Sequence, residues 1–463
     1  MAPRIAALAF IVGIAGLFWL DRDKDHKASK ALWIPFMWFF IACSRALSEW
    51  IYLGPPPAQT NVYMEGSPLD RNFYLVLLIL GLFILFSRAN KVAKILSSNA
   101  PILLYILYGA VSVLWSDYPE IGIKRWIKAV GDLAMILIVL TDAEPVVALK
   151  RLFARLGFLL LPLSVLFIRY YPDLGRSYNR WTWEPSFTGV STNKNMLGLI
   201  ALICGLAAVW RLAALRRDKT APDRGRHLLA QGFLVLNAMY ILLIAHSATS
   251  MSCFYMGAVL ILAAGRPAFL RRPGRLHLLT AGEVCLAAFP LFLGASRLLE
   301  FLGRDPTLTG RTEIWREILK VAPSPMLGTG YGTFWLGNRL TALRQTFEGN
   351  PLMESHNGYI EVYVNLGMIG VILLSIIILV GYSRIFVALR QKAEDANLRL
   401  AFMVIVVIYN FTEAAFKELN PVWIFFLYAA ITPPKDPAPE PPIPVFSQPA
   451  KMKFRETSAL ATR

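Results

Sequence analysis

Charged residues are scarce in this sequence. Asp, Glu, Lys and Arg make up 17% of the 463 residues, whereas a soluble domain carries about 25%. Hydrophobic residues make up 56% and form one long series of apolar runs, which excludes a chain of soluble domains. Lys and Arg outnumber Asp and Glu by 47 to 30, for a net charge of +17. In a membrane protein such an excess lies in the cytoplasmic loops, so we expect no nucleic-acid partner.

Cysteine, nucleotide-binding motifs and metal-ligand clusters are also scarce. The sequence has no P-loop and no Gly-x-Gly-x-x-Gly motif. Residues 21–26 alternate acids with Arg22 and Lys24, which would repel a cation, so we interpret them as a solvated loop. We therefore expect no metal site and no cofactor. Cysteines within membrane helices act as small hydrophobes, so we expect no disulfide framework from the four that lie in apolar runs: Cys43, Cys204, Cys253 and Cys285.

The apolar runs predict an all-α integral membrane protein. A membrane helix needs about 20 mostly apolar residues. Segment 4–20 has only Arg4 as a positively charged start and no small-residue cleavage site before the charged residues that follow it. We therefore expect a retained span rather than a signal peptide. We count thirteen spans, or twelve if one of the two short ones, 129–141 and 421–432, does not cross the membrane. The predicted spans are 4–20, 31–53, 73–87, 100–115, 129–141, 152–168, 195–212, 228–246, 249–265, 277–295, 358–381, 400–416 and 421–432.

The distribution of Lys and Arg sets the orientation of these spans. Alternate crossings place four basic connecting segments on one side, which we expect to be cytoplasmic: 88–99, 211–227, 266–276 and 384–399. The N-terminus then faces the other side and the C-terminus faces the cytoplasm. The loops expected opposite the basic segments are 54–72, 116–128, 169–194 and 296–357.

The chain divides into one membrane domain and a tail. Residues 1–432 form the polytopic membrane domain, and residues 433–463 are rich in proline. Such a tail cannot bury a core, so we expect it to be a disordered cytoplasmic appendage.

The longest predicted loop, 296–357, has the composition of a folded cap rather than a linker. It contains a helical pattern over 311–320, in which Ile314, Trp315, Ile318 and Leu319 share one face. Thr309 can cap the start of this helix, and Pro323 lies beyond its end. Loops of this length are usually functional or disordered, and the aromatic content favours a functional one.

Loop 169–194 mixes cations with aromatic rings. Arg176, Arg180 and Lys194 could bind phosphate oxygens, since arginine is a planar donor fork. The Tyr and Trp rings offer flat apolar faces that suit sugars. The alternative is an interfacial aromatic belt with charges that reach the lipid headgroups.

Two residues of the large loop could act in catalysis. Arg311 lies near a predicted helix start, where an anionic group is stabilised; the alternative is an exposed arginine paired with Glu300 or Glu313. His356 lies where the loop re-enters the membrane, and Ser355 or Asn357 could cap the helix that follows. A helix start disfavours imidazolium, so His356 could serve as a neutral general base.

The alternative role for His356 is that of a capping or interfacial histidine. His246, at the polar break 246–250, is the competing histidine and could equally be a buried hydrogen-bonding residue.

Several runs of sequence together resemble one family. The first three surround the large loop: 302–315, which ends in Thr-Gly-Arg-Thr-Glu-Ile-Trp, 327–335, Leu-Gly-Thr-Gly-Tyr-Gly-Thr-Phe-Trp, and 355–370, which begins Ser-His-Asn-Gly. With 115–119, Trp-Ser-Asp-Tyr-Pro, and 187–198, they resemble the O-antigen ligase / O-antigen polymerase family, most of all its ExoQ-type exopolysaccharide polymerases. The resemblance covers about residues 100–430.

This resemblance implies a GT-C-like glycosyltransferase of the bacterial inner membrane, with a periplasmic active site and no metal. Its donor would be an oligosaccharide on undecaprenyl pyrophosphate, and its acceptor would be another glycan or glycolipid. The transfer would invert the configuration of the anomeric carbon. The family's loop arginine maps onto Arg311 and its loop histidine onto His356. The pyrophosphate partner is then Arg176, Arg180 or Lys194, and Trp315 is a further substrate-binding residue.

Other functions remain open from the sequence. A ligase would pass the glycan to lipid A–core, but ligases often carry an arginine near the break at 247–250, where this chain has Ser-Ala-Thr-Ser. A flippase or transporter would show internal repeats and mid-membrane ionisable residues, whereas the charges here gather at the outer edge. A non-catalytic assembly subunit is the third alternative. A polymerase would have a chain-length regulator as a further partner.

Overall fold

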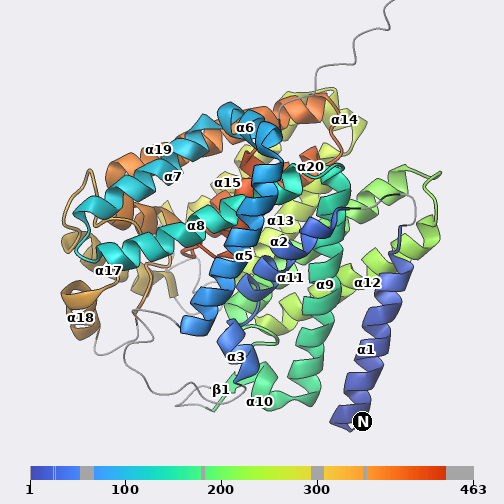
Figure 1. The fold of residues 1–463 in the computed structure, drawn as a ribbon, viewed down its shortest axis with the longest axis horizontal. Coiled ribbons are helices and arrows are strands. Elements are labelled where there is room, and N and C mark those ends of the chain that lie inside the picture. The colour runs from blue at the N-terminus through green and yellow to red at the C-terminus, as the bar shows by residue number, and fades with distance from the viewer. Residues whose placement is uncertain are drawn as a thin grey trace, which may run out of the picture.

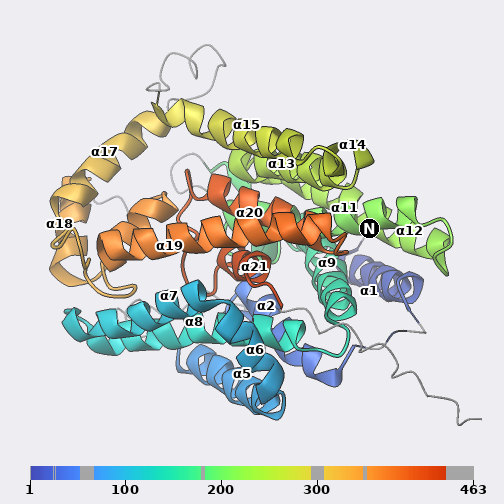
Figure 2. The same cartoon turned by 90° about the horizontal axis from the view of Figure 1, so that it is seen from above.

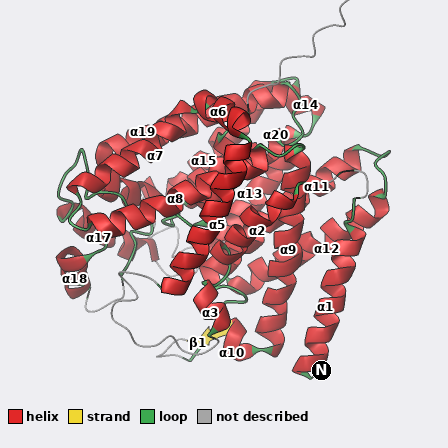
Figure 3. Ribbon diagram, in the orientation of Figure 1, coloured by secondary structure: helices red, strands yellow, loops and turns green. Residues whose placement is uncertain are grey.

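The protein is almost entirely helical (Figure 3). The computed structural model describes residues 2–23, 26, 28–52, 67–178, 183–292, 307–347 and 352–433. Within these residues the only strands are two short ones, β1 and β2. Arg180 and nearly all of the proline-rich tail lie outside the described residues, as does most of loop 54–72.

In the described residues of the first half of the chain there are eleven helical elements and the two strands. They are α1 (Pro3–Leu20), η1 (Lys30–Leu32), α2 (Trp33–Ala42), α3 (Leu47–Ile51), α5 (Pro68–Ser87), α6 (Ala89–Ser98), α7 (Ala100–Ser112), η2 (Val113–Trp115), α8 (Pro119–Leu140), α9 (Pro145–Tyr170), α10 (Pro172–Gly175), β1 (Arg176–Tyr178) and β2 (Pro185–Phe187). The strands pair antiparallel, with Ser177 opposite Ser186.

The second half is helical throughout its described part. Its elements are α11 (Lys194–Arg217), α12 (Arg224–Ala245), α13 (Ala248–Ala264), α14 (Pro267–Leu270), α15 (Pro273–Phe292), α17 (Thr307–Lys320), α18 (Gly337–Thr346), α19 (Gly358–Arg390), α20 (Ala396–Tyr409) and α21 (Pro421–Ala430).

The apolar side chains show that this is a multi-pass membrane protein. In the described part of the chain, six helices are long and apolar enough to cross a membrane, and the bent pair of α6 and α7 adds a seventh. Four shorter apolar helices accompany them. Large hydrophobic side chains face outward, such as Phe83 and Phe86 of α5, which are 73% and 83% exposed. Such surfaces are stable in lipid rather than in water.

The centre of the bundle is formed by α20 and α21, around which the other helices are arranged (Figure 2). Every residue of α21 is buried, as are nearly all residues of α20. Aromatic rings fill this centre: Phe425 stacks on Phe153 of α9 at 5.0 Å between centroids. The buried position suits α21 because this helix has no polar face.

Two faces of the bundle follow from the chain path. The N-terminus, α10 and β1 lie along the lower edge of Figure 1, and α6 and α14 lie along the upper edge. We call the lower one the hairpin face. The upper one, the basic face, holds the predicted basic segments 88–99 and 266–276. These two basic segments thus lie on the same side of the bundle, as the sequence predicts.

The structure corrects the predicted span 31–53. The helix stops at Ala42 and a separate helix, α3, begins at Leu47. Arg45 lies in the break and donates hydrogen bonds to the carbonyl oxygens of Leu174, Gly189 and Ser191. The bonds of Arg45 to the hairpin region fix this break. The sequence did not reveal the break because the residues on both sides of Arg45 are mostly apolar.

Two predicted loops are largely helical. The loop predicted at 116–128 belongs to α8 from Pro119 onward, because a proline at the first helical position is favourable. Its basic residues are compatible with a helix here because some bind protein, as Arg125 does at the carbonyl of Gly332. The segment predicted at 88–99 forms α6, which meets α7 at 92°.

Candidate functional site

The described part of the large loop is folded, as its aromatic content predicts. It forms α17 and α18, which lie to one side of the bundle in Figures 1 and 2. The loop has an apolar core of its own, with Ile318, Phe334, Trp335 and Leu343 at its centre. Helix α17 begins at Thr307, and the predicted Thr309 cap is among side chains that the structure does not describe. Leu319, predicted on the buried face, is 47% exposed.

The loop is joined to α19 by backbone hydrogen bonds. The amides of Thr329 and Gly330 donate to the carbonyls of Val364 and Asn365. At Gly367 the helix is interrupted, with φ +64, and a Cβ atom there would lie 2.1 Å from the carbonyl oxygen of Met326. Only glycine fits this close approach, so the kink lets residues 324–330 pack into the helix.

The start of α19 is fixed by Asn357, one of the two predicted capping residues. Its side chain accepts hydrogen bonds from the amides of Tyr359 and Ile360 at 3.0 and 3.1 Å. Its own amide group donates to the carbonyl of Phe411 at 3.2 Å. The cap therefore also joins α19 to residues 410–420, which we call the connecting segment because they link α20 to α21.

The second predicted capping residue, Ser355, binds Glu361 instead. Its hydroxyl donates to the Glu361 carboxylate at 3.0 Å and to the carbonyl of Asn357 at 2.7 Å. Trp335 also donates to Glu361, at 2.6 Å. Ser355 is fully buried, so these bonds hold the backbone on both sides of His356 in place.

His356 is held in an unusual backbone conformation with its ring accessible. Its φ is +50, in the left-handed region that non-glycine residues seldom adopt. The side chain is 34% exposed. Its Nδ1 lies 3.4 Å from Oε1 of Glu354 and 3.9 Å from Oε2 of Glu413, and it makes no hydrogen bond to a described residue. Backbone strain of this kind clusters at functional sites.

Arg311 and His356 are brought together although 45 positions separate them. The Arg311 guanidinium donates to the carbonyl of Thr412, and its Nη2 lies 3.6 Å from Oε1 of Glu413. One carboxylate, that of Glu413, thus lies beside both predicted catalytic residues. Trp315, one turn along α17 from Arg311, donates to the carbonyl of Ser355 at 2.8 Å. Among the described residues, Arg311 pairs with Glu413 rather than with the predicted alternative Glu313, and the other alternative, Glu300, lies outside them.

A second ion pair completes the cluster. Nζ of Lys417 lies 2.6 Å from Oε2 of Glu354. Burial alone would raise the pKa of Glu354, but the charge and hydrogen bond of Lys417, together with the nearby His356 and Arg311, hold this pKa below its ordinary value. Burial acts to lower the pKa of Lys417, but the charge and hydrogen bond of Glu354, together with the nearby Glu361 and Glu418, raise this pKa overall. Both groups therefore carry their charges at neutral pH.

Sequence reasoning missed Glu413 and Lys417. The prediction placed Glu413 inside the span 400–416, whereas α20 ends at Tyr409. The sequence did offer a signal for a functional role, since Glu413 and Lys417 are charged residues at the end of an apolar run. Ionisable groups at membrane depth are usually functional. The connecting segment is further held by Asp132 of α8, whose carboxylate accepts from the amide of Leu419 and from Trp38, each at 2.8 Å.

The structure also groups possible metal ligands, which the sequence analysis did not expect. Glu354, His356 and Glu413 can each offer one ligand atom, and these atoms lie within 4.8 Å of one another. Both carboxylates already have a cationic neighbour, however, in Lys417 and Arg311. The arrangement is thus an ion-pair network around a histidine.

The other predicted binding residues lie in and beside the hairpin. Arg176 donates through Nε to the carbonyl of Ile168 at 2.9 Å and lies over the ring of Phe187, so part of its side chain is used to hold the hairpin. Lys194 is the first residue of α11 and is exposed. No contact joins either of them to the described residues around His356.

The competing histidine differs from the expectation of a buried one. His246 ends α12 with φ +49 and is exposed. It lies at the turn between α12 and α13, as the polar break predicted.

Comparisons with known proteins agree with the motifs. The family model described as O-antigen ligase matches residues 195–375. The resemblance to the O-antigen ligase family is confirmed. A protein of Rhizobium meliloti (strain 1021), named exopolysaccharide production protein ExoQ, is 28% identical over 356 residues, which cover 73% of this chain and 78% of that protein. The range that matches the O-antigen ligase model contains Arg311 and His356, and it ends before Glu413 and Lys417.

Proposed function

We propose that this protein is a glycosyltransferase that transfers or polymerises undecaprenyl-pyrophosphate-linked oligosaccharide units in the synthesis of an exopolysaccharide or O-antigen. The similarity to the O-antigen ligase family and to the Rhizobium meliloti protein supports a role in polysaccharide synthesis. The observation that carries the proposal is the position of Glu413, beside both Arg311 and the accessible ring of His356.

In the proposed reaction, His356 accepts the proton of the acceptor hydroxyl. The acceptor oxygen then forms a bond to the anomeric carbon of the donor sugar, and the bond from that carbon to the pyrophosphate breaks. A single displacement without an enzyme nucleophile inverts the anomeric centre. Glu354 and Glu413, at 3.4 and 3.9 Å from Nδ1, orient the ring and stabilise the imidazolium that forms.

The leaving pyrophosphate needs positive charge rather than a proton. Arg311 supplies a guanidinium that can stabilise developing negative charge in a partly dry site. The proposed partners of the donor pyrophosphate remain Arg176, Arg180 and Lys194. Of Arg176 and Lys194, which the structure describes, Lys194 is exposed, whereas Arg176 already binds the carbonyl of Ile168. Trp315 is the proposed sugar-binding ring, since its indole lies next to Ser355.

We propose that this chemistry needs no metal. A divalent ion between Glu354, His356 and Glu413 would lie beside Lys417 and Arg311, which already compensate the two carboxylates. Arg311 also supplies the charge that a metal would otherwise bring to the pyrophosphate.

The proposed location is the bacterial inner membrane, with the N-terminus and the active site in the periplasm. Support comes from the positive-inside rule, because the basic face carries Arg and Lys clusters such as those in 211–227 and 266–276.

The test is turnover of a lipid-linked oligosaccharide by the purified protein in detergent. A polymerase lengthens the lipid-linked glycan, and a ligase forms product only when lipid A–core is added. A flippase or an assembly subunit forms no new glycosidic bond, and that result would overturn the proposal. Turnover should be unchanged by a chelator, and loss of activity that Mg²⁺ restores would contradict metal independence. The absence of arginine at 247–250 favours lengthening over transfer to lipid A–core.

A further inference from the structure

A cavity of about 590 Å³ lies at the opposite end of α19 from the candidate site. It is lined by the ends of helices that meet the basic face, including α9, α11, α13 and α19. The part of α19 between its kink at Gly367 and its end at Arg390 alone spans roughly 35 Å. This cavity therefore takes no part in the proposed reaction, and its own chemistry can be considered separately.

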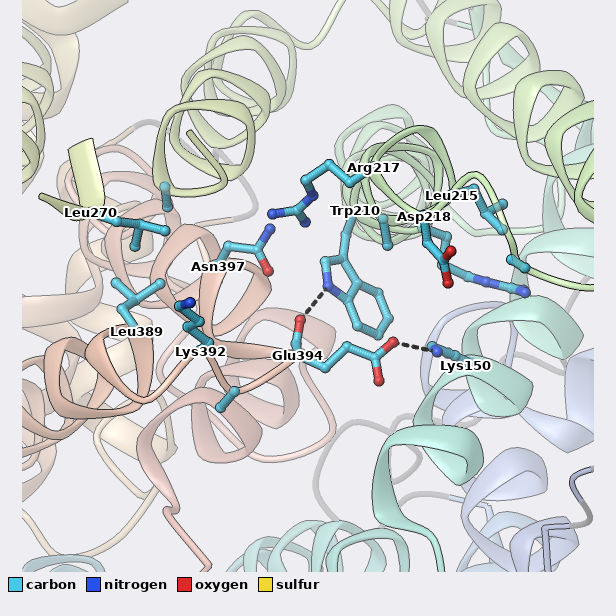
Figure 4. A pocket seen from close by; sticks show the side chains of 15 residues that line it. Lys150, Trp210, Leu215, Arg217, Asp218, Leu270, Leu389, Lys392, Glu394 and Asn397 are labelled. Atoms are coloured by element: carbon cyan, nitrogen blue, oxygen red, sulfur yellow. Dashed lines mark hydrogen bonds and ion pairs between the residues drawn. The ribbon is translucent and has the colours of Figure 1, made fainter. Parts of the chain in front are cut away.

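The floor of the cavity is apolar and rigid. Trp210 is fully buried, and its indole NH donates to the carbonyl of Glu394 at 3.1 Å. Figure 4 shows the Trp210 ring at the centre of the lining, with Leu389 and Leu270 to one side and Leu215 to the other. A ligand with an apolar part would be accommodated here.

The charges on the lining do not balance. Four cations and two acids line the cavity: Lys150, Arg211, Arg217, Lys392, Asp218 and Glu394. Glu394 pairs with Lys150, whereas the Asp218 carboxylate accepts from the amide and hydroxyl of Thr220 and keeps its negative charge. Arg211 pairs with Asp21 outside the lining.

Arg217 and Lys392 therefore remain without an acidic partner among the described residues. Arg217 donates to two carbonyls, those of Ala213 and Gly265, which orient its guanidinium without neutralising its charge. In Figure 4 the guanidinium of Arg217 and the ammonium of Lys392 lie on the same side of the cavity, near Asn397. With Asp218 as the one lining acid outside an ion pair, these two cations leave the lining with a net positive charge above an apolar floor, which favours an anion attached to an apolar group.

We infer that this cavity binds a phosphate-bearing ligand through Arg217 and Lys392. A guanidinium fork and an ammonium are the usual protein partners of phosphate oxygens. The headgroup of an anionic phospholipid and a soluble phosphate ester share this chemistry. The position at the membrane boundary of the basic face gives access to both, and the inference does not depend on the proposed reaction.

The test measures binding to the full-length purified protein in detergent. One arm titrates cardiolipin, with phosphatidylcholine as the zwitterionic comparison of zero net charge, and counts bound lipids by native mass spectrometry. The other arm titrates ATP and inorganic pyrophosphate by calorimetry. The test variant is Arg217→Gln with Lys392→Gln. The matched control, Arg271→Gln with Arg272→Gln, removes the same charge from the same face outside the lining.

We expect one arm to show saturable binding and the test variant to weaken it at least tenfold, with less than twofold change in the control. Binding of cardiolipin alone assigns a lipid site, and binding of ATP or pyrophosphate assigns a soluble ligand. Ala221→Trp, which narrows the cavity without loss of charge, should also weaken binding. Equal weakening in the test and control variants, or no binding in either arm, would overturn the inference.

Discussion

Two clusters in this protein combine a histidine, a carboxylate and an arginine, and they differ in how completely their polar atoms are used. In the first, Asp21 accepts from Arg211, His227 and Gln231 at 2.7–3.1 Å. The second is the candidate site around His356. The first cluster joins the ends of α1, α11 and α12, whereas the second joins α17, the start of α19 and the connecting segment.

Burial and spare hydrogen-bonding capacity separate the two clusters. The side chains of His227 and Asp21 are 11% and 9% exposed, and the ring nitrogen Nδ1 of His227 is bonded. Burial alone would raise the pKa of Asp21, but Arg211 and the hydrogen bonds hold it below its ordinary value. The His356 side chain is 34% exposed, and its Nδ1, which is itself buried, has no hydrogen-bond partner among the described residues. A saturated buried cluster stabilises a fold, whereas an accessible unsaturated one is available for chemistry.

The largest effect should come from removal of the histidine in the candidate site. His356→Ala should lower turnover of the lipid-linked donor by about 10²–10⁴-fold, the usual contribution of a general base. His246→Ala, at an exposed histidine, is the matched control and should retain most activity. Turnover and its pH dependence would be measured on both purified variants. Near-normal turnover of His356→Ala, or a larger loss in the control, would place the base elsewhere.

Arg311→Lys should lower turnover by about 10²–10³-fold, because lysine keeps the charge and loses the donor fork. The loss should appear in kcat when donor concentration is varied. Full activity of Arg311→Ala at normal expression would show that Arg311 only pairs with Glu413.

Glu413→Gln tests whether the shared carboxylate positions both catalytic candidates. We expect a loss of roughly 10–10²-fold together with a changed pH profile, because the removal of a charge at 3.6 and 3.9 Å from these groups should cost no more than one charge-assisted hydrogen bond. Glu413→Asp should recover part of the activity. A change in stability with an unaltered pH profile would give Glu413 a structural role alone.

His227→Ala, in the buried cluster at Asp21, should lower stability and leave turnover nearly unchanged. An unsatisfied partner in a buried cluster costs about 1–3 kcal/mol, so the melting temperature should fall while turnover at low temperature stays close to that of the wild type. A large loss of turnover without a change in melting temperature would show that the cluster at Asp21 also serves the reaction.

The smallest effect concerns the ion pair of Glu354 and Lys417. Because its pKa is lowered in the folded state, Glu354 stabilises the fold above its ordinary value of 4.5, and this contribution is lost as the pH falls through the lowered pKa. The difference in melting temperature between wild type and Glu354→Gln should therefore be present at pH 6 and shrink in acid. A difference that stays constant down to about pH 3 would contradict this assignment.

Part of the candidate site could be predicted because its residues lie in local motifs. Asn357 was predicted as a cap from its place before an apolar run, and it forms that cap. The same local reasoning failed at residues 31–53, because the bonds of Arg45 to Leu174 and Gly189 depend on distant residues. Local reasoning also placed Glu413 within a helix, although α20 ends at Tyr409. The apolar run continues past that residue, and contacts with other parts of the chain, which the run does not reveal, decide where the helix ends.

The sequence by itself determined that this protein is a bundle of membrane helices with a large folded loop, because hydropathy and the spacing of apolar residues are local properties. It also singled out Arg311 and His356. Only the tertiary structure decided that Glu413 lies beside both of them and that Lys417 pairs with Glu354. These contacts join residues up to 102 positions apart, and they exist because α17, the start of α19 and the connecting segment are held together by backbone hydrogen bonds and buried side chains.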